Sequence, residues 1–292
     1  CAMKWEGNRE SDNVEDRRGS SGHSGGGGLF GSKFGIGSII IALAASYFFG
    51  INPLTVLGFL GGSDSPQVQQ GPAQKPPADD VQAKFVSVVL ADTEDVWKDV
   101  FTKGGANYAT PKLVIFRGVT STPCGAGQSA MGPFYCPADQ KVYIDLSFFE
   151  TLKRQMGAGG DFAQAYVVAH EIGHHVQNLL GVHDKVEQAR RRLSERENNA
   201  LSVRVELQAD CYAGLWAKKA HESRQILQTG DIEEAMNAAA RIGDDAIQRQ
   251  STGHVRPDSF THGSSAQRTK WFNIGLQTGS VKACDTFSQR DL

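Results

Sequence analysis

The stretch 161–181, DFAQAYVVAHEIGHHVQNLLG, decides how the rest of the chain is interpreted. Its apolar residues recur at intervals of three and four, which is typical of one side of a helix. In a helix, His170 and His174 lie one turn apart and point the same way. Two imidazoles so placed can bind one Zn²⁺, and Glu171 beside them can act as a general base on water. The apolar flanks favour this site over two histidines on a solvated helix face.

A catalytic zinc site needs a third protein ligand and an open position. Glu206 is the best candidate, because it lies in an otherwise apolar helical stretch, LSVRVELQADCYAG. Asp210 follows four residues later on the same face, where it can accept the free N–H of a ligating histidine. A solvated helix face is the alternative interpretation of this pair. His183, His221 and His254 lie in polar contexts and remain further candidates for the third ligand.

Composition limits the class of protein. The chain has 292 residues, of which 40% are hydrophobic and 21% charged, enough for a domain of roughly 200 residues with a sizeable core. Its net charge of −2 and the lack of a long basic stripe argue against nucleic acid as a partner. Besides Cys1 there are four cysteines without the CxxC spacing of a Cys₄ zinc site. We predict two disulfides in an oxidising compartment, and their pairs are Cys124–Cys136 and Cys211–Cys284.

Four regions are predicted along the chain. Residues 1–33 mix charges with a glycine run and are predicted to form a disordered cytoplasmic tail. Residues 34–60 carry no charge and are long enough to cross a bilayer core of about 30 Å. Residues 61–79 are rich in Gly, Pro and Gln, which is typical of a linker. Residues 80–292 are predicted to form the folded zinc-binding domain.

We interpret residues 34–60 as a transmembrane helix. A buried core helix is the alternative, but glycine-rich and proline-rich tracts flank the stretch on both sides. It begins too far into the chain for a typical cleaved signal peptide. Arg17, Arg18 and Lys33 precede it, and no Lys or Arg follows until Lys75, so the N-terminus is expected to stay inside. This predicts a single-pass protein of the cytoplasmic membrane, with its domain in the periplasm or outside the cell.

Periodicity also predicts elements within the domain. Helices are expected at 81–105, 161–180, over most of 185–220, 231–249 and 265–277. Strands are expected at 112–118 and 141–146. If strand 141–146 is exposed, it could align an extended peptide by strand addition.

Three segments give the chain a family resemblance: HEIGHHVQ, VELQADCYAG, and FTHGSSAQR with the nearby pair WF. Together they resemble the bacterial neutral zinc metallopeptidase family, a membrane-anchored relative of the HExxH-plus-Glu (gluzincin) proteases. The RESDNVEDRRG tail and the single span resemble that family too, so the resemblance covers nearly the whole chain. It implies an α+β, zincin-like fold, mainly helical, with a small sheet above the active-site helix. It also implies that His170, His174 and Glu206 bind zinc and that Glu171 is the base.

The segment FTHGSSAQR also resembles the STHP…R segment of membrane-associated HExxH peptidases, with Gly263 in place of the proline. His262 is therefore a candidate catalytic donor to the oxyanion of the transition state. An exposed loop histidine is the alternative. Arg268, six residues further on, could anchor this loop or bind a substrate carbonyl.

These observations favour a membrane-anchored zinc metalloendopeptidase that acts on peptide or protein substrates with one catalytic zinc ion. The alternative is a membrane-tethered zinc-binding scaffold without proteolytic activity. Glu171 and a set of only three ligands favour the enzyme, because a structural zinc site closes with four ligands and has no use for a base.

Overall fold

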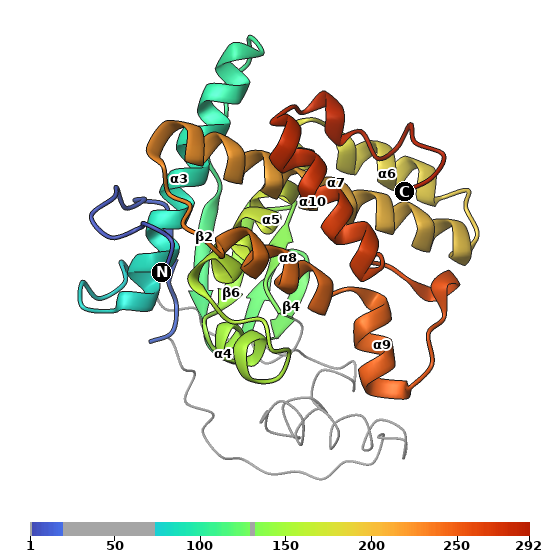
Figure 1. Ribbon diagram of the computed structural model, residues 1–292, viewed down its shortest axis with the longest axis horizontal. Coiled ribbons are helices and arrows are strands. Elements are labelled where there is room, and N and C mark those ends of the chain that lie inside the picture. The colour runs from blue at the N-terminus through green and yellow to red at the C-terminus, as the bar shows by residue number, and fades with distance from the viewer. Residues whose placement is uncertain (1, 20–73, 129–131) are drawn as a thin grey trace.

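The computed structural model describes residues 2–19, 74–128 and 132–292 (Figure 1). The predicted span at 34–60 and most of the predicted linker at 61–79 lie outside the described residues. Within these ranges no helix is both long and apolar enough to cross a bilayer. The membrane span therefore stays a prediction.

A four-stranded sheet forms the centre of the domain, in the order β1-β2-β6-β5. Its strands are β1 (Val14–Asp16), β2 (Lys112–Phe116), β6 (Lys141–Asp145) and β5 (Phe134–Cys136). Strands β1, β2 and β6 run parallel, whereas β5 is antiparallel to β6. Four successive residues of β2 are buried, because a strand between two covered faces must be apolar on both sides. A separate hairpin joins β3 (Val119–Thr122) and β4 (Gly125–Gln128).

Helices make up most of the domain. They are α3 (Val81–Lys103), α4 (Ser147–Arg154), α5 (Asp161–Leu179), α6 (Val182–Arg190), α7 (Glu195–Arg224), α8 (Asp231–Arg241), α9 (Asp244–Thr252) and α10 (Ser265–Thr278), with short 3₁₀ turns η2 (Pro257–Ser259) and η3 (Lys282–Cys284). The mainly helical α+β fold with small sheets is as predicted. The helix predicted over 185–220 is broken, because Ser194 forms a capping box with Glu197 and starts α7 there. The helix predicted over 231–249 is likewise split into α8 and α9.

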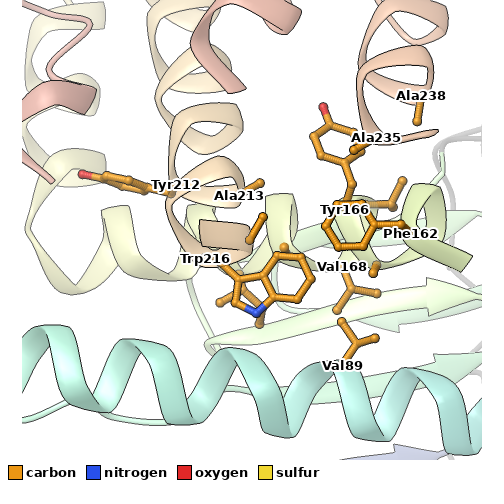
Figure 2. Packing of buried hydrophobic residues seen from close by; sticks show 14 of the residues in the cluster. Val89, Phe162, Tyr166, Val168, Tyr212, Ala213, Trp216, Ala235 and Ala238 are labelled. Atoms are coloured by element: carbon orange, nitrogen blue, oxygen red, sulfur yellow. The ribbon is translucent and has the colours of Figure 1, made fainter. Parts of the chain in front are cut away.

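The helix α5 lies at the centre of the hydrophobic core. Figure 2 shows Phe162 of α5 beside Trp216 of α7, with Val89 of α3 on one side and Ala235 of α8 on the other. The Phe162 and Trp216 rings stack with their centroids 5.7 Å apart. Because α5 is packed against α3, α7 and α8, among others, its polar residues are held in fixed positions.

Close packing of α5 on α7 and two disulfides shape the domain around the predicted ligands. Gly173 lies on α5, between the two histidines of the motif, and a Cβ there would come within 3.0 Å of the backbone of Ala209 on α7. Glycine at this position therefore permits the close approach of α5 and α7, which a larger residue would have to widen by a few tenths of an ångström. Both predicted disulfides are confirmed: Cys124–Cys136 ties the β3–β4 hairpin to β5, and Cys211–Cys284 ties α7 to η3.

The N-terminal residues differ from the prediction. Instead of a disordered tail, the described residues 2–18 pack on the domain and supply β1, which pairs with β2 in register Val14↔Leu113. Met3 is only 3% exposed. The prediction of a disordered tail is wrong here because scattered apolar residues, Met3 and Val14, and polar side chains together hold this segment in place. Neither forms a periodic pattern that the sequence reveals.

Candidate metal centre

Two helices supply three possible metal ligands at one point. His170 and His174 come from α5 and Glu206 from α7, and one ligand atom of each lies within 4.8 Å of the others. Nε2 of His170 is 3.1 Å from Oε2 of Glu206, and Nε2 of His174 is 3.4 Å from Oε1. Both imidazoles thus turn the same nitrogen toward one carboxylate. Within the described residues, no other group of His, Cys, Asp and Glu converges in this way.

The opposite ring nitrogens have partners of their own. Nδ1 of His170 lies 2.8 Å from Oδ1 of Asp210, and Nδ1 of His174 lies 2.8 Å from Oε1 of Gln177. Gln177 in turn donates to the carbonyl of Val205 on α7 at 2.8 Å. An acceptor at Nδ1 holds the proton on that nitrogen and leaves the Nε2 lone pair for a metal. In their neutral forms, which metal binding requires, the two imidazoles and one carboxylate are a donor set that suits Zn²⁺.

Asp210 is the centre of a buried hydrogen-bond network. It is fully buried and accepts bonds from Arg268 Nε at 2.9 Å and Tyr166 Oη at 2.5 Å in addition to His170. Arg268 is only 2% exposed and points its guanidinium at Asp210. The predicted role of Arg268 in binding substrate is therefore wrong. The reason is that a buried carboxylate needs a positive partner, and α10 places Arg268 in that position.

The electrostatics of the three ligands favour a cation. Burial disfavours the charged imidazolium of His170, but Asp210 and Glu206 outweigh burial and raise the pKa of His170 to about 10. Burial also opposes the charge of Glu206, yet His174 and His170 hold the pKa of Glu206 well below its usual value. The centre therefore stabilises positive charge, which a divalent metal supplies.

Glu171 lies beside this centre without belonging to the converging set. It follows His170 on α5 and is 8% exposed. Burial, as the largest effect, raises the pKa of the Glu171 carboxyl above its ordinary value. A carboxylate with a raised pKa holds an abstracted proton better, which suits a general base.

His262 is fixed by a residue that the sequence analysis missed. Oδ2 of Asp244, the first residue of α9, accepts backbone N–H bonds from Thr261, His262 and Gly263 at 2.6–3.0 Å. Its Oδ1 lies 3.2 Å from Nδ1 of His262. The His262 side chain remains 54% exposed. The hydrogen bond to Asp244 is the main cause that raises the pKa of His262.

The same loop packs against the helix that carries Glu206. Gly263 has φ of +91°, and a Cβ there would lie 3.1 Å from the side chain of Leu207. The negative charge of Glu206 also contributes to the raised pKa of His262. The structure therefore brings the His262 loop to the Glu206 side of the metal centre.

The remaining candidate histidines do not join the converging set. His183 contacts the carbonyl of His174 through Nε2 at 3.1 Å. His221 Nδ1 accepts a bond from the backbone of Leu227, and His254 lies in the exposed stretch after α9. Of the two supporting residues that were missed, Gln177 was detectable, since it lies three residues after His174 on one helix face. Asp244 left no local signal.

Two histidines and a glutamate form this centre, and a second glutamate, Glu171, lies on the helix of the histidines. This arrangement is of the metallopeptidase type. The chain belongs to the family described as "putative neutral zinc metallopeptidase", whose sequence profile matches residues 3–287. This confirms the family predicted from the motifs.

Relatives of the chain are found in bacteria. It is 53% identical over 293 residues to the uncharacterized protein YpfJ of Escherichia coli (strain K12). The aligned region covers 98% of this chain and 99% of YpfJ. It is 47% identical over 207 residues to the uncharacterized protein Rv2575 of Mycobacterium tuberculosis (strain ATCC 25618 / H37Rv), 68% of each chain. No solved structure was found to match.

Proposed function

We propose that this protein is a zinc-dependent endopeptidase whose metal is held by His170, His174 and Glu206. The observation that carries the proposal is the convergence of two Nε2 atoms and one carboxylate, with Glu171 beside them on the same helix. A zinc ion in this position would polarise the scissile carbonyl and lower the pKa of the attacking water.

Glu171 acts as the general base in this proposal. It takes a proton from the attacking water and passes it to the leaving amine. Its raised pKa supports both steps, since the carboxyl must gain the proton and then lose it. Asp210 and Gln177 keep the two imidazole rings oriented through their Nδ1 contacts.

His262 stabilises the transition state. Its Nδ1 faces Asp244, which leaves Nε2 as the atom that can donate to the developing oxyanion. Asp244 raises the pKa of His262 and so favours the doubly protonated, donating form. Asp244 acts as the positioning residue, because it holds both the ring and the backbone of the loop.

An extended substrate would lie along β5. The strand 141–146 suggested for this role is not an exposed edge, because β6 pairs with β2 on one side and β5 on the other. Among the described strands, β5 is the edge on this side of the sheet. Tyr135 of β5 contacts His175 at 3.0 Å and accepts a bond from Asn178 at 3.1 Å, so the strand runs beside α5. A peptide could add to it through backbone hydrogen bonds.

A pocket on the helix that carries Glu206 offers room for a substrate side chain. It has a volume of about 520 Å³ and opens between α7 and the loop that leads to His262. Val203 and Phe260 give it apolar walls, and Arg204 adds a basic group. Val203 lies on α7 three residues before Glu206, so the pocket and the carboxylate ligand share one helix.

The variant Glu171→Gln separates the enzyme from a zinc-binding scaffold. The full chain, loaded with one equivalent of zinc, is incubated with a mixed peptide library, and products are identified by mass spectrometry. We expect Glu171→Gln to retain zinc and lose cleavage, whereas Glu187→Gln, at a 73% exposed side chain on α6, retains both. A wild-type protein that binds zinc and cleaves nothing would support the scaffold instead.

A further inference from the structure

The two ends of the segment that the structure does not describe lie next to each other on the domain. The backbone N–H of Asp16 donates to the carbonyl of Gln74 at 2.7 Å, and the two residues form an antiparallel bridge. Asp16 ends β1, which is paired with β2 at three positions. Gln74, where the described chain resumes, is therefore held at the end of β1, three residues from the last described residue before the gap.

The N-terminal segment satisfies buried groups of the domain. Glu94 on α3 is 2% exposed, and it accepts bonds from Ser11 and Asn13, both at 2.7 Å, and from Arg9 at 3.1 Å. A buried carboxylate that loses such partners is strongly destabilising. The domain thus needs residues 2–18 in its own compartment when it folds.

Hydrophobic contacts of residues 2–18 also show that the domain needs this segment in order to fold. Trp5 packs edge-on against Phe85 of α3 with ring centroids 5.3 Å apart, and its Nε1 donates to Asp161, the first residue of α5. Lys4 donates its backbone N–H to the carbonyl of Ile226. The N-terminal segment therefore connects the first turn of α5 with α3 and with the residues after α7.

The fold also accounts for two of the three basic residues on which the predicted orientation rested, Arg17 and Arg18. Arg17 pairs with Glu15 at 2.9 Å. Arg18 pairs with Asp16 and with Asp80, the N-cap of α3, both at 2.6 Å. These guanidinium groups are ion-paired within the folded domain, so their presence before residue 34 is explained without a cytoplasmic N-terminus.

We propose that residues 2–18 and the zinc-binding domain lie on the same side of the membrane, the oxidising side on which both disulfides form. On this proposal, the membrane association predicted from the charge-free sequence 34–60 is made from that side, without a single crossing between residues 19 and 74. Two full crossings would need about 40 apolar residues, more than this stretch provides. The proposal replaces the single-pass topology, and it does not depend on peptidase activity.

Cysteine labelling in right-side-out membrane vesicles tests the proposal on the full chain. Cys1→Ser serves as background, because the other four cysteines are paired. Glu6→Cys reports on the N-terminal segment and Lys103→Cys, at a 72% exposed side chain, on the domain. We expect both variants to sediment with the vesicles and to react with a membrane-impermeant maleimide before detergent is added, to the same extent.

The other outcomes overturn the proposal. If only Lys103→Cys is labelled before detergent, the N-terminal segment lies on the other side and the single-pass topology holds. If both variants are labelled only after detergent, the whole protein lies on the reducing side. A chain that does not sediment with the vesicles would refute the contact with lipid.

A second measurement does not depend on labelling. The double variant Asp16→Cys/Gln74→Cys should form a cross-link in native membranes, since residues in such a bridge lie within disulfide distance. Asp16→Cys/Lys103→Cys is the matched control, because Lys103 ends α3 and lies roughly 34 Å along the helix from Asp80, which Arg18 connects to Asp16. Absence of the first cross-link in folded protein would refute the shared location.

Discussion

Asp210→Asn is the most informative single substitution in this protein. The carboxylate accepts hydrogen bonds from His170, Tyr166 and Arg268, and both of its oxygens accept from the guanidinium. Asparagine offers one oxygen and one NH₂ group. In a fully buried position, that NH₂ group must face a donor, so at least one contact becomes repulsive.

Two separate losses follow from this change. Arg268 keeps its charge in a buried position without a carboxylate partner, and breaking a buried ion pair in this way costs about 3–5 kcal/mol of unfolding free energy. His170 also loses the acceptor that orients its ring, and residues in such supporting positions typically change metal affinity by about 10–100-fold. That corresponds to about 1.4–2.8 kcal/mol of zinc-binding free energy.

Asp92→Asn is the matched control. Asp92 is 5% exposed on α3 and accepts bonds from Trp216 Nε1 at 2.9 Å and Arg224 Nε at 2.8 Å. It thus resembles Asp210 as a buried partner of an arginine, but it contacts no ligand. Thermal unfolding of both variants and competition with a chromophoric chelator should show lower stability in both, and lower zinc affinity only in Asp210→Asn.

A double variant separates the two losses further. Asp210→Asn/Arg268→Gln removes the unpaired charge, so it should recover part of the stability while zinc affinity stays low. The reasoning is refuted if Asp210→Asn binds zinc as tightly as wild type. It is equally refuted if Asp92→Asn weakens zinc binding by the same factor, because the effect would then be general destabilisation.

Three further substitutions test other parts of the structure. His262→Ala should lower kcat by about 10²–10³ with unchanged zinc content, and wild-type turnover would leave His262 as an ordinary loop residue. Glu206→Gln should abolish stoichiometric zinc binding, as measured by metal analysis after gel filtration; retained zinc would place the third ligand elsewhere. Burial disfavours the Glu15 charge, but two lysines and an arginine outweigh burial and lower its pKa to about 2. Glu15 therefore stabilises the fold above pH 4.5, by about 1–2 kcal/mol after allowance for solvent screening, and this contribution is lost as pH falls toward 2. Denaturant titrations of Glu15→Gln should converge with wild type at that limit, and a constant difference would contradict the ion-pair explanation.

Periodic sequence patterns predicted the parts of the site that lie on long helices. The HExxH spacing placed His170 and His174 on one face, and an acidic residue in an apolar helix indicated Glu206. These predictions succeed because helix geometry converts sequence spacing directly into direction. Asp210 was predicted as the partner of a histidine for the same reason, and the structure places it 2.8 Å from His170.

Contacts between distant segments were not predictable in this way. Asp244 holds His262 from eighteen residues away, across a loop whose path no local pattern defines. Arg268 was predicted to anchor the His262 loop or to bind a substrate carbonyl, and only the packing of α10 on α7 shows that it is buried against Asp210. Strand β1 was missed because three residues are too few for an alternating pattern to be recognised.

The place of β1 in the sheet has a consequence for the order of folding. Val14 pairs with Leu113, which is 99 residues later in the chain (113 − 14). At a synthesis rate of about 5–20 residues per second, the first strand waits roughly 5–20 s before its partner is made. Contacts of such long sequence separation form slowly, because a long loop must close before any pairing energy is gained. The earliest part of the chain to be synthesised is therefore expected to be among the last to reach its native position, and until then the Glu94 side chain lacks its native partners.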